Sequence, residues 1–300
     1  MADAQAPARP ASAAIPTPAL RRVRRGETWR RLARNELTVA GAIILAVVMV
    51  VAIFAPYLSP HDPLGMNASQ LLQPPSREHL MGTDELGRDV LSRVIWGARI
   101  SLYVGVISVT MAVVVGVTLG LLAGYHGGLI DDAINRVLDV VFAFPTILLA
   151  LGILGMLGSS LTNTMIAIGV VYTPVYARLA RGTTLAIKQR EFVEAAVVSG
   201  ARSFRIIIRH ILPNVMAPLI IQTSLSLSLA ILAEASLSFL GLGTQPPDPS
   251  WGTMVSTGQA LVELSPWPVV FPGLAIVLAV LAFNLIGDGL RDALDPRLRS

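Results

Sequence analysis

The chain has 300 residues, of which 53% are hydrophobic and only 14% are charged, and its mean hydropathy is +0.65. This composition is too apolar for a soluble domain of that size, so we expect a membrane protein. The chain contains no cysteine, which excludes disulfides and thiolate metal sites. The formal charge of +4 does not indicate a nucleic-acid partner, because the basic residues lie beside apolar runs and no nucleic-acid motif accompanies them.

Residues 1–34 are expected to form a cytosolic, partly disordered basic tail. The first twenty positions are rich in Ala and Pro, and seven arginines follow between positions 21 and 34. A charge-free stretch from Leu37 to Leu58 is long enough to cross a bilayer of about 30 Å. Residues 35–58 are therefore the predicted first transmembrane helix. This stretch is longer than the apolar region of a cleaved signal peptide, and the arginines before it favour a cytosolic N-terminus.

Residues 59–99 are polar and contain four prolines, which predicts an irregular external loop. Asp and Gly favour turns, and Asp84, Arg88, Asp89 and Arg93 are close enough in sequence to pair locally. Asp and His in one loop could also hold a metal ion. No two of these candidates have the spacing of metal ligands, so we expect no metal site.

Residues 100–290 are the expected transmembrane core. Span two, residues 100–123, places small residues at every fourth position, which favours close packing of helices in lipid. These residues are Ala112, Gly116, Gly120 and Gly124. After a short turn at 125–136, the charge-free stretch 140–177 is too long for one helix and is expected to break at 158–163 into spans three and four.

Span five is expected to run from Pro213 to about Glu234, and span six covers residues 267–286. Residues 236–266 between them form a second, compact external loop in which Trp251 is expected near the membrane interface, and 291–300 form a cytosolic tail. A carboxylate costs about 2.5–3.5 kcal/mol at the bilayer centre. Glu234 is therefore expected near the interface or buried in protein, and it is a candidate for a polar contact in the translocation path.

A polar, basic segment from Arg190 to Pro213 separates two long apolar stretches. Phe192, Ala195, Ala196 and Ser199 recur at helical spacing, which predicts one small apolar face of a short helix. Gly200 predicts that this helix ends in a left-handed turn, and Ser203 is a candidate N-cap of a second short helix. Two readings remain open on the pattern alone: a docking element, or a cytosolic loop whose charges face water.

Several motifs carry a resemblance to a known family. Glu194-Ala195-Ala196, Gly200 and Leu212-Pro213 resemble the EAA loop of permease subunits in bacterial ATP-binding-cassette (ABC) importers, although His210 replaces an Ile of the general pattern. The run GTDELGRDVLSR at 82–93 resembles a segment of the dipeptide, oligopeptide and nickel permeases of the C type. The phrases at 239–252 and 287–296 are similar to the same branch, so the resemblance covers nearly all of residues 35–297.

This resemblance implies an all-α membrane protein with about six transmembrane helices of the type I ABC importer permease fold and a cytosolic coupling helix. It implies that loop 183–213 contacts a cytosolic ATPase through Phe192, Glu194, Ala195, Ala196, Gly200, Arg202, His210, Leu212 and Pro213. It also marks an external-loop motif made of Gly82, Thr83, Asp84, Gly87, Arg88, Asp89 and Arg93.

The implied partners are a second homologous permease, two ABC ATPase subunits that hold ATP and Mg²⁺, and an extracytoplasmic substrate-binding protein. The chain has no GxxxxGK[ST] phosphate loop, so we expect no catalytic residue and no cofactor on it. The implied place is the bacterial inner membrane, and the implied cargo is a di- or oligopeptide. A nickel chelate or another small solute stays open as cargo.

Charge distribution agrees with this topology, because six spans and a cytosolic N-terminus put nineteen Lys and Arg residues inside and four outside, with both termini in the cytosol. An ion-coupled secondary carrier is the competing class. Such carriers show repeats and central carboxylates, and neither is evident here. An intramembrane enzyme is not supported either, because there is no HExxH or GxSxG motif and the four histidines are predicted on opposite sides of the membrane.

Overall fold

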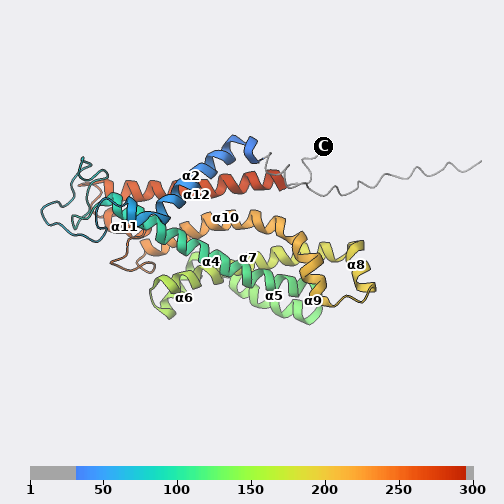
Figure 1. Ribbon diagram of the computed structural model, residues 1–300. Coiled ribbons are helices and arrows are strands. Elements are labelled where there is room, and N and C mark those ends of the chain that lie inside the picture. The colour runs from blue at the N-terminus through green and yellow to red at the C-terminus, as the bar shows by residue number, and fades with distance from the viewer. Residues whose placement is uncertain (1–31, 295–300) are drawn as a thin grey trace, which may run out of the picture.

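The structure is a computed structural model that describes residues 32–294 (Figure 1). Over that range every regular element is a helix, which confirms the predicted all-α class. The helices are α2 (Glu36–Ile53), α3 (Ala55–Leu58), α4 (Val90–His126), α5 (Gly128–Phe142), α6 (Thr146–Leu157), α7 (Leu161–Lys188), α8 (Glu191–Val198), α9 (Ser203–Ile206), the π-helix η1 (Ile207–Ile211), α10 (Leu212–Phe239), α11 (Trp251–Gln259) and α12 (Trp267–Leu294). The predicted tails up to residue 31 and from 295 onward lie outside the described residues.

Four helical segments among residues 32–294 are long and apolar enough to cross a membrane. They are α2, α4, the continuous segment Ser203–Phe239 that contains α10, and α12. Helices α5 and α6 add a fifth span if they count as one, although they are bent by 92°. This criterion therefore finds four or five of the about six spans expected.

The expected fourth span is the one that does not meet it. Helix α7 has 28 residues, but polar side chains and Pro174 interrupt its apolar sequence. Its buried face includes Thr164, Thr173 and Thr184. A helix face that packs against protein does not need to be apolar, so these residues lower the mean hydropathy of a helix that is still part of the bundle.

Two predicted boundaries were wrong. Helix α4 begins at Val90 and not near 100, because the Asp89 side chain caps its first turn by accepting from the backbone N–H of Ser92. The expected turn at 125–136 is instead mostly the helix α5. The break expected at 158–163 is present, between α6 and α7. A second break precedes Pro145, whose ring disfavours helical backbone in the residue before it.

The small residues of α4 pack against α7, as predicted. A Cβ added at Gly116 would lie 2.7 Å from Cβ of Tyr176, and one added at Gly120 would lie 2.7 Å from Cβ of Ala180. Real Cβ atoms do not approach that closely, so both positions require glycine at this helix spacing. The two backbones therefore come together through the absence of side chains, which is how helices associate tightly in lipid.

The second half of the chain completes the bundle. Pro213 lies in the first turn of α10, where its missing N–H costs nothing, and α10 continues five residues beyond Glu234 to Phe239. The expected external loop 236–266 contains the helix α11, which starts with a capping box between Ser250 and Thr253. Trp251 is only 1% exposed and donates to the Val94 carbonyl at 3.0 Å. It is therefore part of the core and not an interfacial side chain.

Candidate functional site

The two polar motifs of the sequence lie at opposite ends of the bundle. Helices α8 and α9 are at one end, whereas α11 and the loop that precedes α4 are at the other (Figure 1). The long helices α4, α10 and α12 run between them. Any coupling between these two ends therefore has to pass along the helices.

The turn after α8 is a Schellman motif centred on Gly200. The φ angle of Gly200 is +75°, its N–H donates to the Val197 carbonyl at 2.9 Å, and the Ala201 N–H donates to the Ala196 carbonyl at 3.1 Å. These are the two bonds that define the motif, and the left-handed residue is almost always glycine. The prediction that Gly200 ends the first short helix is confirmed.

The surface of α8 differs from the predicted face. Val193 is 1% exposed and points into the core, and Ala196 packs against that core. Phe192 and Ala195 are exposed, as is Ser199 just after the helix. The predicted face is thus divided, with Ala196 holding α8 to its own chain and the other three residues facing outward.

Large apolar side chains are exposed on and around α8 and α9. The exposed fractions are 44% for Phe192, 54% for Val197, 88% for Val198 and 75% for Phe204. A cluster of this kind marks an interaction surface when it lies outside the lipid. Below, the "α8–α9 surface" means Phe192, Ala195, Val197, Val198 and Phe204.

The segment after the turn corrects one prediction. Ser203 is the first residue of α9 and not its N-cap, and Arg202 occupies the cap position without a side-chain hydrogen bond. The chain then forms the π-helix η1, which includes His210. The imidazole of His210 lies near the ring of Phe192, with 6.5 Å between centroids, so η1 packs beside α8.

Glu194 lies in the first turn of α8, where a carboxylate interacts favourably with the helix dipole. Within residues 32–294 its carboxylate makes no ion pair and no side-chain hydrogen bond. Its exposed carboxylate can therefore contact another subunit.

Ion pairs that sequence reasoning missed tie the end of α7 to α5. Arg181 binds Asp131 through two bonds of 2.6 Å, and Arg178 binds Asp139 at 2.6 Å while its guanidinium lies 3.9 Å from the centroid of the Phe142 ring. Opposite charges on either side of the charge-free stretch 140–177 were the available signal. These pairs brace the helix from which α8 projects.

The external-loop motif forms a buried polar network. One oxygen of Asp84 accepts from the backbone N–H groups of Leu86 and Arg88 at 2.9 Å each. Its other oxygen binds Nε of Arg88 at 2.7 Å and lies 3.4 Å from Nε of Arg93. Asp84, Arg88 and Arg93 are all less than 8% exposed. The predicted local pairing is confirmed for these three residues.

Two glycines and a threonine complete this loop. Gly82 and Gly87 have φ angles of +77° and +71°, and a Cβ at Gly82 would lie 2.5 Å from the Gln73 carbonyl oxygen. The Thr83 hydroxyl is fully buried and accepts from the Gln73 N–H at 2.8 Å. Because the polar groups are satisfied inside the loop, the motif stabilises its shape.

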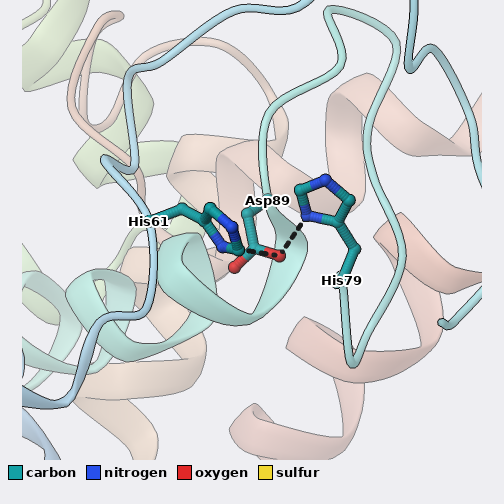
Figure 2. A group of neighbouring side chains, drawn as sticks. All are labelled: His61, His79 and Asp89. Atoms are coloured by element: carbon teal, nitrogen blue, oxygen red, sulfur yellow. Dashed lines mark hydrogen bonds and ion pairs between the residues drawn. The ribbon is translucent and has the colours of Figure 1, made fainter. Parts of the chain in front are cut away.

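Asp89 departs from the predicted pairing. Within residues 32–294 its carboxylate binds no arginine. One carboxylate oxygen accepts from the N–H and hydroxyl of Ser92 at 2.7 Å each. The other oxygen lies 2.9 Å from Nδ1 of His79 and 3.8 Å from Nδ1 of His61. Figure 2 shows the carboxylate between the two imidazole rings.

Glu234 is completely buried in protein, as one of the two predicted alternatives required. Its carboxylate accepts from the hydroxyls of Ser101 at 2.9 Å and Ser238 at 2.7 Å, and the Thr244 hydroxyl lies 3.4 Å away. The side chain thus joins α10 to α4 and to the loop before α11. Hydroxyl donors on both oxygens offset the cost of burying this group.

Comparison with known proteins identifies the family. The profile of the binding-protein-dependent transport system inner membrane component matches residues 116–300, and that of the N-terminal TM domain of oligopeptide transport permease C matches residues 24–75. The chain belongs to the binding-protein-dependent transport permeases. This confirms the predicted family and its place as a multi-pass permease of the inner membrane.

Curated relatives resemble the permease over almost all of its length. It is 48% identical to the dipeptide transport system permease protein DppC of Alkalihalophilus pseudofirmus, covering 91% of this chain and 90% of the relative. It is 46% identical to the di/tripeptide transport system permease protein DppC of Pseudomonas aeruginosa, with 91% and 92% covered. It is 45% identical to the glutathione transport system permease protein GsiD of Pectobacterium atrosepticum, with 91% of each covered.

A solved structure resembles the fold of the permease. The MetNI methionine ABC transporter in an inward-facing conformation superposes with a TM-score of 0.55 at 17% identity, covering 68% of this chain and 96% of the solved chain. The likeness confirms the predicted type I ABC importer permease fold.

Proposed function

We propose that this permease carries di- or oligopeptides across the bacterial inner membrane as one subunit of an ABC importer, with ATP hydrolysed by partner subunits. The observation that carries the cargo class is 48% identity over 91% of the chain to a dipeptide permease. Glutathione, the cargo named for another relative, is itself a tripeptide. Short peptides are thus the shared chemistry, and a nickel chelate is the alternative cargo.

The α8–α9 surface is the proposed contact with a cytosolic ATPase. Exposed apolar side chains around a glycine turn supply buried area for a partner, and the unpaired carboxylate of Glu194 supplies a polar contact. Arg202 is also exposed beside it. In this proposal Ala196, Leu212 and Pro213 hold the segment in place, and His210 packs behind Phe192.

The proposed assembly contains a second homologous permease, two ATPase subunits that bind ATP and Mg²⁺, and an extracytoplasmic binding protein. This chain would hold no cofactor. The end with α8 would face the cytosol together with both termini, and α11 with residues 59–89 would face outward to receive the binding protein. The excess of Lys and Arg on the cytosolic side of that arrangement supports it.

Nucleotide can drive transport only if it binds the two conformations of the assembly with different affinity. The proposed route for this energy runs from the docked α8 into α7, which the ion pairs of Arg181 and Arg178 attach to α5. Glu234 stays a candidate for the translocation path, where a change in its hydrogen bonds would accompany the movement of α10 against α4.

Cysteine cross-linking tests the ATPase contact directly, because the native chain has no cysteine. Val198→Cys introduces one thiol on the α8–α9 surface, and Met156→Cys at the end of α6 is its matched control, since both side chains are 88% exposed. We expect a photoactivatable cross-linker attached to the introduced thiol to join only the Val198→Cys variant to a co-expressed ATPase subunit. Equal cross-linking of both variants, or of neither, would refute the assigned surface.

Transport assays test the cargo and the energy source. Proteoliposomes that contain the purified importer and its binding protein should take up a labelled dipeptide only with internal ATP, and a protonophore should not reduce this uptake. Uptake that requires a proton gradient and no ATP would instead indicate a secondary carrier. Competition with unlabelled glutathione and with nickel chelates distinguishes the cargo classes.

A further inference from the structure

We propose that His61, His79 and Asp89 form a site for one divalent transition-metal ion of the zinc class in the external loop (Figure 2). His79 lies 18 residues after His61 and 10 residues before Asp89 in the sequence. The two histidines come from separate turns of the loop. One donor atom from each residue lies within 4.8 Å of the other two. Two imidazoles and a carboxylate are a common zinc ligand set that leaves a fourth position for water.

The hydrogen bonds around His79 show which of its nitrogens is available. Its Nε2 lies 3.2 Å from Oε1 of Gln70. The orientation of that amide is set independently, because Oε1 accepts from Nδ2 of Asn67 at 2.8 Å and Nε2 of Gln70 donates to Glu78 at 3.3 Å. The imidazole Nε2 must therefore be the donor, which leaves the lone pair of Nδ1 toward Asp89 in the neutral ring.

The lone pair on Nδ1 of His79 faces a lone pair on a carboxylate oxygen of Asp89. Nδ1 of His79 is 2.9 Å from a carboxylate oxygen of Asp89, and two acceptors repel at this distance unless a cation lies between them. Ser92 occupies the other oxygen of Asp89 with two donors, so the carboxylate cannot rotate away without losing the cap of α4. The arrangement of Gln70, His79 and Asp89 thus calls for a positive charge at this point.

His61 distinguishes a metal ion from a proton. Its Nδ1 is buried and has no hydrogen-bond partner in residues 32–294, and it lies 3.8 Å from the same oxygen of Asp89. A proton between His79 and Asp89 would satisfy one pair and leave His61 unpaired. A metal ion would accept all three donor atoms, and the amide of Gln70 would be the outer partner that orients a metal-binding histidine.

The distances are close to those of a bound ion. Zinc bonds to nitrogen and oxygen are about 2.0–2.2 Å long, so two ligand atoms on a tetrahedral ion lie about 3.4 Å apart. The separations of 2.9 Å and 3.8 Å lie within about 0.5 Å of this value. The widest separation allowed by the 4.8 Å bound would close by about 1.4 Å. The His61 side chain is 38% exposed and has room to make this movement.

A bound ion would fasten the segment after α3 to the start of α4. His61 follows α3 closely, its backbone N–H donates to the Ser92 hydroxyl at 3.1 Å, and Asp89 caps α4. Coordination by all three side chains would therefore stiffen the external loop. This inference is independent of the cargo and of the ATPase contact proposed above.

Zinc binding by the full-length chain tests the proposal. The protein is purified in mild detergent with the subunits it retains, using a tag without histidine, and is titrated with Zn²⁺ against a chromophoric chelator. His61→Asn is the test variant, because His61 makes no side-chain hydrogen bond among residues 32–294 and its loss should not unfold the loop. His126→Asn is the matched control, since His126 is an exposed histidine at the far end of α4.

We expect the wild type and His126→Asn to bind one more Zn²⁺ per chain than His61→Asn. Loss of a direct ligand should weaken binding by more than the roughly 10–100-fold that loss of an outer partner costs. His61→Cys should restore binding, because a thiolate is a zinc ligand. With Co²⁺ as probe, the visible absorption of the bound ion should depend on residue 61 in the same way.

Three results would overturn the proposal. In the first, the protein retains no Zn²⁺ against the chelator. In the second, the wild type and His61→Asn retain equal amounts. In the third, thermal stability depends on pH and does not change with added Zn²⁺. The last outcome would assign the cation at this point to a proton. None of these readings depends on transport activity, so they stand apart from the outcome of the uptake assays.

Discussion

Replacing Gly200 tests whether the shape of the turn after α8 is what transmits ATP hydrolysis. Gly200 has a φ angle of +75°, and a Cβ added there meets no heavy atom within 4 Å. A substitution therefore acts through backbone strain and not through a clash inside the chain.

The size of the effect follows from the left-handed backbone. Holding a residue other than glycine there costs roughly 1–2 kcal/mol, and the cost is greatest for β-branched side chains. Such a cost lowers the ratio of native to non-native conformations of the turn by a factor of about 5–30. If the chain relieves the strain by changing φ, it gives up the two bonds of the Schellman motif and redirects α9.

The assay is ATP-dependent dipeptide uptake, normalised to the amount of permease in the membrane. We expect Gly200→Val to insert normally and to lose at least about tenfold in uptake, in line with the population shift of the turn. Gly200→Asn is the control, because asparagine tolerates the left-handed region, and it should retain most of the activity. Normal uptake by Gly200→Val would refute the reasoning. An equal loss in both variants would show that bulk at this position, and not the turn, is what matters.

Three further experiments test contacts between the helices. Glu234→Leu leaves buried hydroxyls without an acceptor and should lower the stability of the protein in detergent by about 1–3 kcal/mol, whereas Glu234→Gln should lower it less. Thermal unfolding measures both variants. No loss of stability with leucine would contradict the hydrogen-bond network. Gly120→Ala should destabilise by about 1–3 kcal/mol through overpacking against α7, whereas Gly152→Ala, with open space around it, should not. A double-mutant cycle of Arg181→Ala and Asp131→Ala should give a coupling within about 0.2–1 kcal/mol, because the pair is partly exposed, and zero coupling would remove its bracing role.

Local signals were enough to predict the segment that we assign to the ATPase. The spacing from Phe192 to Ser199 predicted a short helix, and Gly200 predicted a left-handed turn after it. The structure has both, because each depends only on residues a few positions apart. The small residues at 116 and 120 were equally informative, because only close packing needs them at this interval. The roles of individual residues toward the ATPase stay predictions.

Features that depend on surroundings were harder to predict. Helix α7 was expected as the fourth span, yet polar residues on its buried face, such as Thr164 and Thr173, interrupt its apolar sequence. The bend between α5 and α6 was missed, since a long apolar stretch conceals the break at Pro145. Ser203 has the chemistry of an N-cap, but the helix begins one residue early and leaves Arg202 at that position.

The histidines show why spacing in sequence did not reveal the cluster for which we propose a metal ion. His61 and Asp89 are far apart in sequence, and no helical or strand period relates them. They meet because the turns at Gly82 and Gly87 fold the intervening chain back on itself. A cluster made by loop closure has no signature in local spacing, and only the folded arrangement brings its donor atoms together.

Burial separates the roles of two motifs that look alike in sequence. Both the segment at 82–93 and the segment at 190–213 are short, rich in charge and marked by glycine. In the first, Asp84 and Arg88 are buried and bind each other, so their polar groups are spent on holding the loop. In the second, Glu194 and Phe192 face outward, and their groups stay available to another protein. A substitution in the first motif should therefore act through stability, whereas one on the α8–α9 surface should reduce transport while leaving the unfolding temperature of the chain unchanged.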